Sequence, residues 1–158
     1  KGIREFNTQY ALLNMVDQKN WYEMITDKNS DRIMFMITDK LNRLIGVCGL
    51  IHLNKTTHSA NIAIIIGNQK FHGKGFGTET LHLLIEYGFN SLSLHKIIAE
   101  VFEYNKISMK LFKKFGFQHE VTQRETLWRN GKWWNIHVLS LLEKNYNIQP
   151  LRSDNKIP

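Results

Sequence analysis

One stretch of the chain, His72 to Glu79, constrains the backbone strongly, because three of its residues are glycines at alternate positions. It follows an apolar run, Ile62 to Ile66, and precedes a run with helical spacing, Thr78 to Leu92. Glycine permits sharp bends and lets another group approach the backbone closely. A helix that begins after such a turn presents unpaired N–H groups and a positive dipole end, which together can hold phosphate. Glycine-rich turns between a strand and a helix also occur without a ligand, so the turn alone leaves both interpretations open.

Length and charge restrict the class of protein only modestly. The 158 residues are enough for one domain with a substantial core. The net charge of +7 suits an anionic ligand, and also a nucleic acid or a membrane surface. The basic residues are scattered, however, with an adjacent pair only at Lys113-Lys114, so we expect no nucleic-acid partner. No apolar run approaches the roughly 20 residues that cross a bilayer, so we expect no membrane partner either.

The single cysteine, Cys48, lies in an apolar run, which excludes an intramolecular disulfide framework and indicates a core position. Together with the lack of a signal peptide, it predicts a cytoplasmic protein. The seven histidines are dispersed, so no metal site is predicted. No Ser/His/Asp or Cys/His arrangement suggests a covalent nucleophile.

The hydrophobic pattern predicts an alternation of strands and helices. Apolar runs predict strands at Arg32–Thr38, Leu44–Leu53, Ala60–Gly67, His95–Glu103, Phe117–Trp128 and Trp133–Leu142. Helical spacing predicts helices at Met15–Ile25, Thr78–Leu92 and Asn105–Phe115. This order favours an α/β (α+β) fold, in which helices pack on a mixed sheet.

Several local signals refine this pattern. Asn130-Gly131 between two strand-like runs is typical of a β-hairpin. Gly116 is a suitable residue to end the helix before it. In the helix after the glycine turn, one face is apolar and predicted to be buried. The opposite face is predicted to be exposed and carries Glu79, His82, Glu86 and Asn90.

A second motif, Asn105 to Phe117, lies one element downstream of the glycine turn and combines an Asn, an amphipathic helix and Gly-Phe. The Asn105 side chain can cap the helix. It can also hydrogen-bond a ligand that runs past the end of the preceding strand, and one residue can do both.

Together, His72–Gly77 and Asn105–Phe117 resemble the two signature motifs of the GNAT acetyltransferase superfamily. The chain is most similar to its branch of spermidine, ribosomal-protein-alanine and amino-sugar N-acetyltransferases. Glu79, Tyr87-Gly88-Phe89 and Gly131-Lys132-Trp133 are typical of that branch.

The resemblance implies one domain over residues 1–146, followed by a tail at 147–158. It implies a mixed, mostly antiparallel sheet flanked by helices, with a splayed parallel pair, Ala60–Gly67 and His95–Glu103, that holds the cofactor. The branch normally opens with a further strand and helix, which we expect to be missing from this chain or supplied by another one. A homodimer is a further expectation.

The cofactor implied by the resemblance is acetyl-CoA, as a co-substrate. Its pyrophosphate would lie on the glycine turn, and its pantetheine arm would pair with the preceding strand. A backbone N–H near Ile66 would polarise the acetyl carbonyl. The implied cofactor-binding residues are Ile64, Ile65, Ile66, His72, Gly73, Lys74, Gly75, Phe76, Gly77, Thr78, Asn105 and Phe112.

Three positions depart from the family pattern. His72 opens the glycine turn, where Arg or Gln is common. A histidine there can still donate a hydrogen bond to phosphate, with a charge that depends on pH. Phe112 replaces a frequent Tyr acid and cannot donate a proton. Asn61 replaces a frequent Glu and cannot act as a base.

A primary amine with a pKa near 10 must lose a proton before or during attack on the thioester. Positioning and the oxyanion contact can supply most of the catalysis, with protons moved by water. Glu103 and Tyr104 are the candidate catalytic residues for proton transfer. The alternative is a solvated charge at a strand end and a packing residue. His52 and His58 are further candidates with structural alternatives of their own.

The sequence therefore predicts an acetyl-CoA-dependent N-acetyltransferase acting on the primary amine of a small molecule, a polyamine or an amino sugar. One alternative is a protein N-terminal acetyltransferase of the ribosomal-protein type. The other is a non-catalytic acyl-CoA-binding module, which the absence of the usual acid and base at Phe112 and Asn61 favours.

Overall fold

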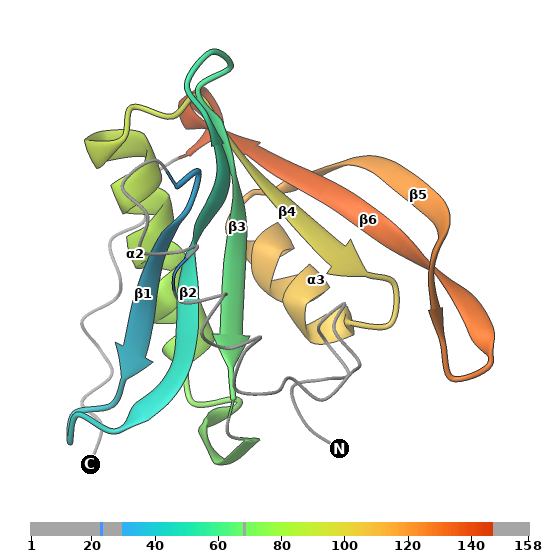
Figure 1. The fold of residues 1–158 in the computed structure, drawn as a ribbon, viewed down its shortest axis with the longest axis horizontal. Coiled ribbons are helices and arrows are strands. Elements are labelled where there is room, and N and C mark those ends of the chain that lie inside the picture. The colour runs from blue at the N-terminus through green and yellow to red at the C-terminus, as the bar shows by residue number, and fades with distance from the viewer. Residues whose placement is uncertain (1–22, 24–29, 68, 147–158) are drawn as a thin grey trace.

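The computed structural model describes residues 23, 30–67 and 69–146. These residues form a six-stranded sheet with the strand order β1-β2-β3-β4-β6-β5 (Figure 1). The strands are β1 (Ile33–Thr38), β2 (Leu44–Asn54), β3 (Ser59–Ile66), β4 (Lys96–Phe102), β5 (Gln118–Arg129) and β6 (Lys132–Leu142). β3 and β4 are parallel, and the other neighbouring pairs are antiparallel. This confirms the predicted mixed, mostly antiparallel sheet.

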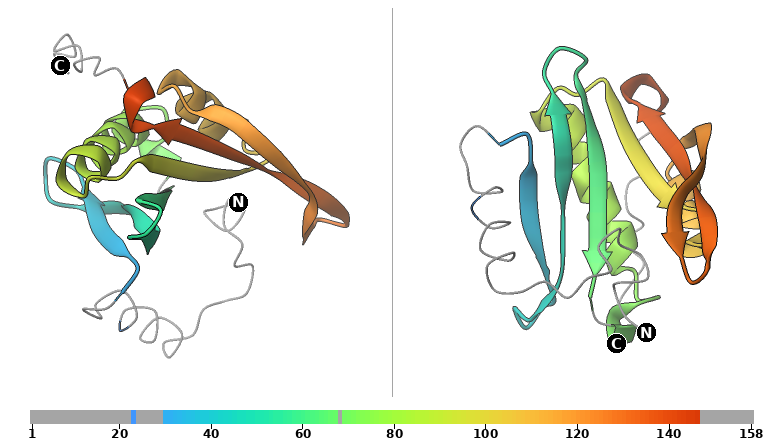
Figure 2. Two further views of the ribbon diagram at one scale, coloured as in Figure 1. Left: turned by 90° about the horizontal axis from the view of Figure 1, so that it is seen from above. Right: turned by 45° about the vertical axis from the view of Figure 1, so that its right-hand side comes forward.

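Two helices cover one face of the sheet, α2 (Phe76–Glu86) and α3 (Lys106–Lys114) (Figure 2). Short helical turns flank them at η2 (Gln69–Phe71), η3 (Tyr87–Ser91) and η4 (Glu143–Asn145). The core lies between these helices and the sheet, and its fully buried side chains include Leu50, Leu81, Ile85, Ile97, Leu139 and Leu141. Apart from Glu23, the predicted helix at Met15–Ile25 lies outside the described residues, as does the tail at 147–158.

The helix predicted over Thr78–Leu92 differs from the structure at both ends. It begins earlier, at Phe76, because Gly75 takes a left-handed conformation (φ 89°) that turns the chain directly into the helix. It then widens into a π-helical turn, η3. A Cβ at Gly88 in this turn would lie 2.9 Å from Ile97 Cδ1, so a glycine lets the helix approach β4 closely.

The prediction that His82 is exposed was wrong. The residue is only 6% exposed, because its ring packs near Phe115 and its Nδ1 lies 3.2 Å from the Tyr146 hydroxyl. Its Nε2 faces Glu86 at 3.5 Å. Tyr146 follows the last strand, far from His82 in sequence. The local helical pattern therefore could not predict this contact.

The hairpin signal at Asn130-Gly131 is confirmed. Both residues have positive φ (53° and 75°) and form a two-residue turn between β5 and β6. Two tryptophans at the tip, Trp128 and Trp133, pack edge to face and remain more than half exposed. The hairpin projects away from the helices (Figure 2).

The parallel pair β3 and β4 diverges. Their paired residues are Ser59↔Lys96, Ala60↔Ile97 and Asn61↔Ile98, although both strands continue beyond them. Over the same stretch β3 stays paired with β2, and β4 with β6 (Figure 1). We call the opening between Ile62–Ile66 and Glu100–Phe102 the fork. It confirms the predicted splayed parallel pair.

Candidate functional site

The edge of β3 that faces the fork carries backbone groups of Ile64 and Ile66. The Gly67 N–H donates to the Ile45 carbonyl in β2 (2.8 Å), and Ile65 is paired with Val47. Because backbone polar groups alternate in direction along a strand, those of Ile64 and Ile66 point away from β2, into the fork. An open strand edge of this kind can bind an extended chain through its amides. The backbone groups of Ile64 and Ile66 are therefore open to the fork, while those of Ile65 face β2.

The glycine turn leads from the open end of the fork into α2. Gly73 and Gly75 have φ values of 74° and 89°, and a Cβ on either would meet no atom within 4 Å. The first hydrogen bond of the helix runs from Glu79 N–H to the Gly75 carbonyl (3.0 Å), so the preceding N–H groups have no partner within the helix. The backbone before α2 is thus open and rich in donors, which fits an anionic group.

Gly77 has a different role from the other two glycines of the turn. It lies inside α2, where a Cβ would be 3.6 Å from Leu111 Cδ2 and 3.7 Å from Ile66 Cδ1. These are ordinary packing distances, so Gly77 lies where α2 meets α3 and the end of β3. Phe76 and Thr78 beside it are partly buried in the first turn of the helix.

Two cations converge on the aromatic ring beside the turn. Lys74 Nζ lies 6.0 Å from the centre of the Phe71 ring, and Arg43 Cζ lies 5.9 Å from it. Arg43 also pairs with Asp39 (2.6 Å) and its hydrogen bonds lower the pKa of that carboxyl group. Sequence reasoning missed Arg43, because it reaches the turn from the loop between β1 and β2.

His72 points back to β3. Its Nε2 lies 2.9 Å from the Ile66 carbonyl oxygen, which can only accept, so the imidazole N–H is the donor. The ring is exposed and belongs to the first residue of the glycine motif. His72 therefore connects the turn with the backbone edge of the fork.

Asn105 caps α3, as predicted for its structural role. Its Oδ1 accepts a hydrogen bond from the Ser108 N–H (3.1 Å). The side-chain NH2 group takes no part in this bond, so its predicted ligand contact stays a prediction. Phe112 is 7% exposed and packs edge to face on Phe117, with ring centres 5.0 Å apart.

The two predicted catalytic residues directly follow β4, and residues of the β5–β6 hairpin form hydrogen bonds with both. Glu103 Oε2 accepts a hydrogen bond from the Asn135 N–H (3.2 Å). The Tyr104 hydroxyl accepts one from Arg129 Nη1, and its ring packs edge to face on Trp134 at 4.9 Å. Both side chains thus have structural partners, and their roles in proton transfer stay predictions.

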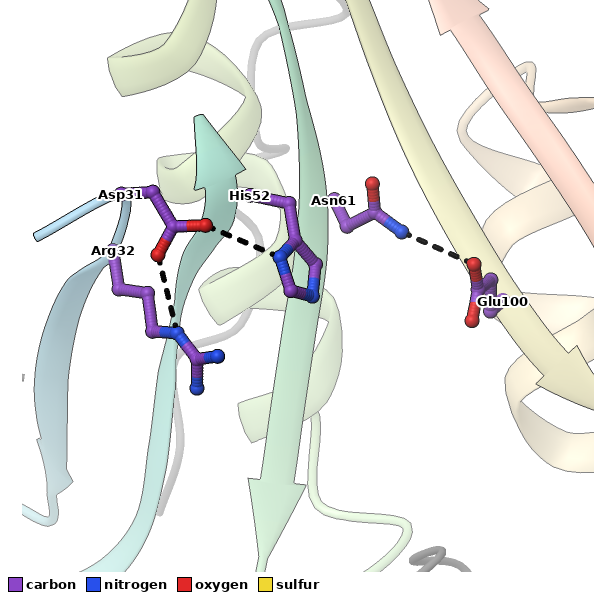
Figure 3. Close-up of polar contacts among 5 residues, drawn as sticks. All are labelled: Asp31, Arg32, His52, Asn61 and Glu100. Carbon is purple, nitrogen blue, oxygen red and sulfur yellow. Dashed lines mark hydrogen bonds and ion pairs between the residues drawn. The ribbon is translucent and has the colours of Figure 1, made fainter. Parts of the chain in front are cut away.

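Asn61 and Glu100 face each other at the closed end of the fork (Figure 3). Asn61 Nδ2 donates to Glu100 Oε1 at 3.3 Å, from the last paired residue of β3 to a residue just beyond the paired part of β4. Ile97, Ala99 and Val101 point into the core, so the alternation places Glu100 on the sheet face opposite α2 and α3.

Sequence reasoning missed Glu100. Its signal in the sequence was a charged residue in the middle of the apolar run from Ile97 to Phe102. The contact between the two became visible only once the register of β3 and β4 was known.

The two candidate histidines lie in different places. His52 Nδ1 lies 3.2 Å from Asp31 Oδ2, in a cluster that includes Arg32 (Figure 3). His58 Nδ1 bonds the Ser93 carbonyl at 3.2 Å, before the paired end of β3. His58 therefore has a structural partner away from the open end of the fork.

No cluster of three or more potential metal ligands occurs among the described residues. Within the same part of the chain, none of the helices has the length and apolar character needed to span a membrane.

Comparison with known proteins identifies a family model that matches most of this chain. The family model of the acetyltransferase (GNAT) domain matches residues 3–118. A spermidine N(1)-acetyltransferase of Vibrio cholerae is 31% identical over 118 residues, which are 75% of this chain and 67% of that protein. An uncharacterized N-acetyltransferase, p20 of Bacillus licheniformis, is 33% identical over 111 residues, 70% of this chain and 62% of the relative. The matched part thus spans about two thirds of the length of these relatives.

Solved structures agree with the sequence relatives. The crystal structure of spermidine N-acetyltransferase from Vibrio cholerae in complex with CoA and spermine superposes with a TM-score of 0.84 and 26% sequence identity. The alignment covers 91% of this chain and 84% of that one.

Proposed function

The chain belongs to the GNAT acetyltransferase family, and on this premise we propose that it transfers an acetyl group from acetyl-CoA to the primary amine of a small molecule. The observation that carries the proposal is the fork, whose open β3 edge leads directly into a donor-rich glycine turn. A polyamine is the first choice of acceptor, because similar proteins are spermidine acetyltransferases and one was solved with CoA and spermine. An amino sugar is the second small-molecule acceptor.

Acetyl-CoA would supply an activated acetyl thioester. The N–H groups around Gly73 and Gly75 would hold its diphosphate, with Lys74 and Arg43 adding positive charge nearby. The backbone of Ile64 and Ile66 would align its amide-containing arm in the fork. An N–H group at the end of β3 would stabilise negative charge that develops on the acetyl oxygen.

We assign the proton-accepting role to Glu100. The family's frequent Glu on β3 is Asn61 here, and the Asn61 amide donates to a carboxylate on β4 instead. This places a carboxylate at the closed end of the fork, on an exposed face that an amine can reach. Because a carboxylate is a much weaker base than an alkyl amine, it would accept the proton during attack, directly or through water.

The function can be tested by incubating the protein with acetyl-CoA and a panel of spermidine, spermine, amino sugars and peptides, while following release of the CoA thiol. We expect turnover with polyamines. A preference for a peptide would move the acceptor to protein N-termini. Measurable CoA affinity without turnover on any amine would overturn the enzyme assignment and favour the acyl-CoA-binding module.

Glu100→Gln keeps the shape of the side chain and removes its basicity. We expect kcat to fall by about 10²-fold with little change in CoA affinity. Glu103→Gln is the matched comparison, because Glu103 lies three positions along the same segment and bonds the backbone of β6. A larger loss of kcat for Glu103→Gln than for Glu100→Gln would transfer the role to Glu103.

A further inference from the structure

His52 lies in a bulge of β2 that changes the direction of its side chain. The register of β2 against β3 shifts between Ile51 and Asn54, and His52 within this interval has a φ of 54°. Regular alternation would place His52 on the same side of the strand as Leu50, which is fully buried in the core. The His52 side chain is instead exposed on the sheet face opposite α2 and α3, beside Asn61 (Figure 3). Bulges often redirect a side chain next to an active site, and a left-handed backbone at a residue with a Cβ is uncommon elsewhere.

Asp31 fixes the orientation of the His52 ring. Its Oδ2 lies 3.2 Å from His52 Nδ1, and its Oδ1 lies 3.3 Å from Arg32 Nε. The Asp31 carbonyl also accepts a hydrogen bond from the Leu53 N–H (2.8 Å), so both the backbone and the side chain of Asp31 bond to β2. An ionised carboxylate can only accept, so Nδ1 carries the hydrogen and Nε2 keeps its lone pair in the neutral imidazole. The pair therefore presents Nε2 as a base.

The same sheet face carries the carboxylate that we assign to the acceptor amine. Asn61 lies between His52 and Glu100, and its Nδ2 donates to Glu100 Oε1 at 3.3 Å (Figure 3). β2, β3 and β4 are neighbouring strands, about 4.8 Å apart where they pair. Charged groups around His52 are Asp31 and Arg32, which precede β1, and Glu100, across β3. An amine at the closed end of the fork thus has an imidazole on its β2 side and a carboxylate on its β4 side.

Acetyl transfer to an alkyl amine removes two protons from its nitrogen. At neutral pH the acceptor is an ammonium ion with a pKa of about 10, and it must lose one proton before its lone pair can attack. The second proton leaves the nitrogen during attack. A single carboxylate serves both steps only if it passes the first proton to solvent in between, and imidazole is the stronger base of the two.

We propose, on the basis of the proposed function, that His52 is a second catalytic base, which deprotonates the incoming ammonium ion before attack. One N–H bond of the ammonium breaks, its electron pair stays on the nitrogen, and a new N–H bond forms at His52 Nε2. Asp31 stabilises the resulting imidazolium, and the exposed ring then passes the proton to solvent. Glu100 accepts the second proton during attack and returns it to the departing thiolate, so one proton reaches solvent and the other the CoA thiol.

His52→Gly tests the proposal by chemical rescue. Glycine adopts a positive φ without strain, and the His52 side chain is 55% exposed, so the variant should fold and leave room for free imidazole. With the best acceptor of the amine panel, we expect kcat/KM at pH 7 to fall about 100-fold, and added imidazole to restore part of the loss. His58→Gly is the matched control, because His58 is also exposed, has a positive φ (48°) and bonds through Nδ1. It should keep its activity and show no response to imidazole.

The pH profile of kcat/KM is a second readout. Without the base, the reaction depends on acceptor molecules that have already lost their proton in solution, and their fraction rises about tenfold per pH unit below the amine pKa. We therefore expect the deficit of His52→Gln relative to wild type to shrink between pH 7 and pH 9. Asp31→Asn removes the orienting charge and keeps the imidazole, so it should show a smaller deficit with the same trend.

A deficit that is equal at every pH and that imidazole does not change would show a purely structural role for His52. It would overturn the proposal while leaving the acetyl-transfer function intact, and so would wild-type rates in His52→Gly. No turnover by wild type on any amine of the panel would instead overturn the proposed function.

Discussion

Several side chains of the candidate site are positioned by hydrogen bonds to backbone groups. His72 bonds the carbonyl of Ile66, Glu103 accepts from the N–H of Asn135, and Asn105 caps its own helix. Such a bond fixes a side chain through the main chain, so it does not depend on the side-chain type of the partner residue. Residue type alone therefore does not tell which groups a carboxylate such as Glu103 or Glu100 contacts.

Cys48 gives a prediction at this scale. The residue is 6% exposed within β2, and burial raises the pKa of its thiol to about 11. The thiolate is the reactive form, so at about pH 8 the native protein should react very slowly with a disulfide reagent such as Ellman's reagent.

The measurement is the release of chromophore before and after addition of guanidinium chloride. One thiol per chain should appear only on unfolding, and Cys48→Ser should give no signal. Rapid release from the native protein would contradict the assignment of Cys48 to the core.

At the scale of elements, the strand, turn and helix around the glycine motif act as a unit. β3 supplies an open edge, the turn supplies N–H groups that have no partner within α2, and α2 continues the direction of the turn. The positive φ values of Gly73 and Gly75 show that the turn uses glycine for conformation and for open space at once. At Gly77, by contrast, the glycine lies where α2 packs against α3 and the end of β3.

Replacing Gly75 by Glu tests this unit. The new side chain would enter open space, and its negative charge would oppose an anionic ligand, so we expect CoA affinity to fall by about 100-fold or more while the fold survives. Calorimetric titration measures the affinity. Gly131→Glu is the matched control, because Gly131 also has a positive φ (75°) and open space at its Cβ. If both variants lost affinity equally, the loss would not come from the turn.

Much of the element order could be predicted from the sequence, because each strand and helix carries its own period and its own turn residues. The hairpin at Asn130-Gly131 and the cap at Asn105 are local signals, and both were correct. The burial of His82 depends on Tyr146, and the pairing of Asn61 with Glu100 depends on the register of two strands. Such contacts join residues far apart in sequence, so no local pattern records them.

At the scale of the whole molecule, the described sheet consists of two parts, β1-β2-β3 and β4-β6-β5, joined at the closed end of the fork. Ile97 lies at this junction. It pairs with Ala60 on one side and Leu141 on the other, is fully buried, and packs beneath Gly88 of η3. The two parts therefore share a core, and the helices above it connect them further.

Ile97→Ala should lower the free energy of unfolding by about 2–5 kcal/mol, and Ile97→Val by about 0.5–1.5 kcal/mol. Urea unfolding followed by tryptophan fluorescence and by circular dichroism measures both. Three of the four tryptophans lie in the β5–β6 hairpin, so fluorescence reports mainly on one part of the sheet. Coincident transitions are expected, and separate ones would show that the parts unfold independently.

The fork has a consequence for solubility. Its β3 edge carries the run Ile64-Ile65-Ile66. The backbone groups on the fork side of this run form no hydrogen bonds with β4. Strand edges of this composition are templates for aggregation, and proteins usually protect them with charges, prolines or bulges. Here such protection would block the ligand as well. We therefore expect CoA to delay heat-induced aggregation, measured by light scattering. A ligand that pairs with the open β3 edge would also prevent that edge from pairing with another copy of the chain.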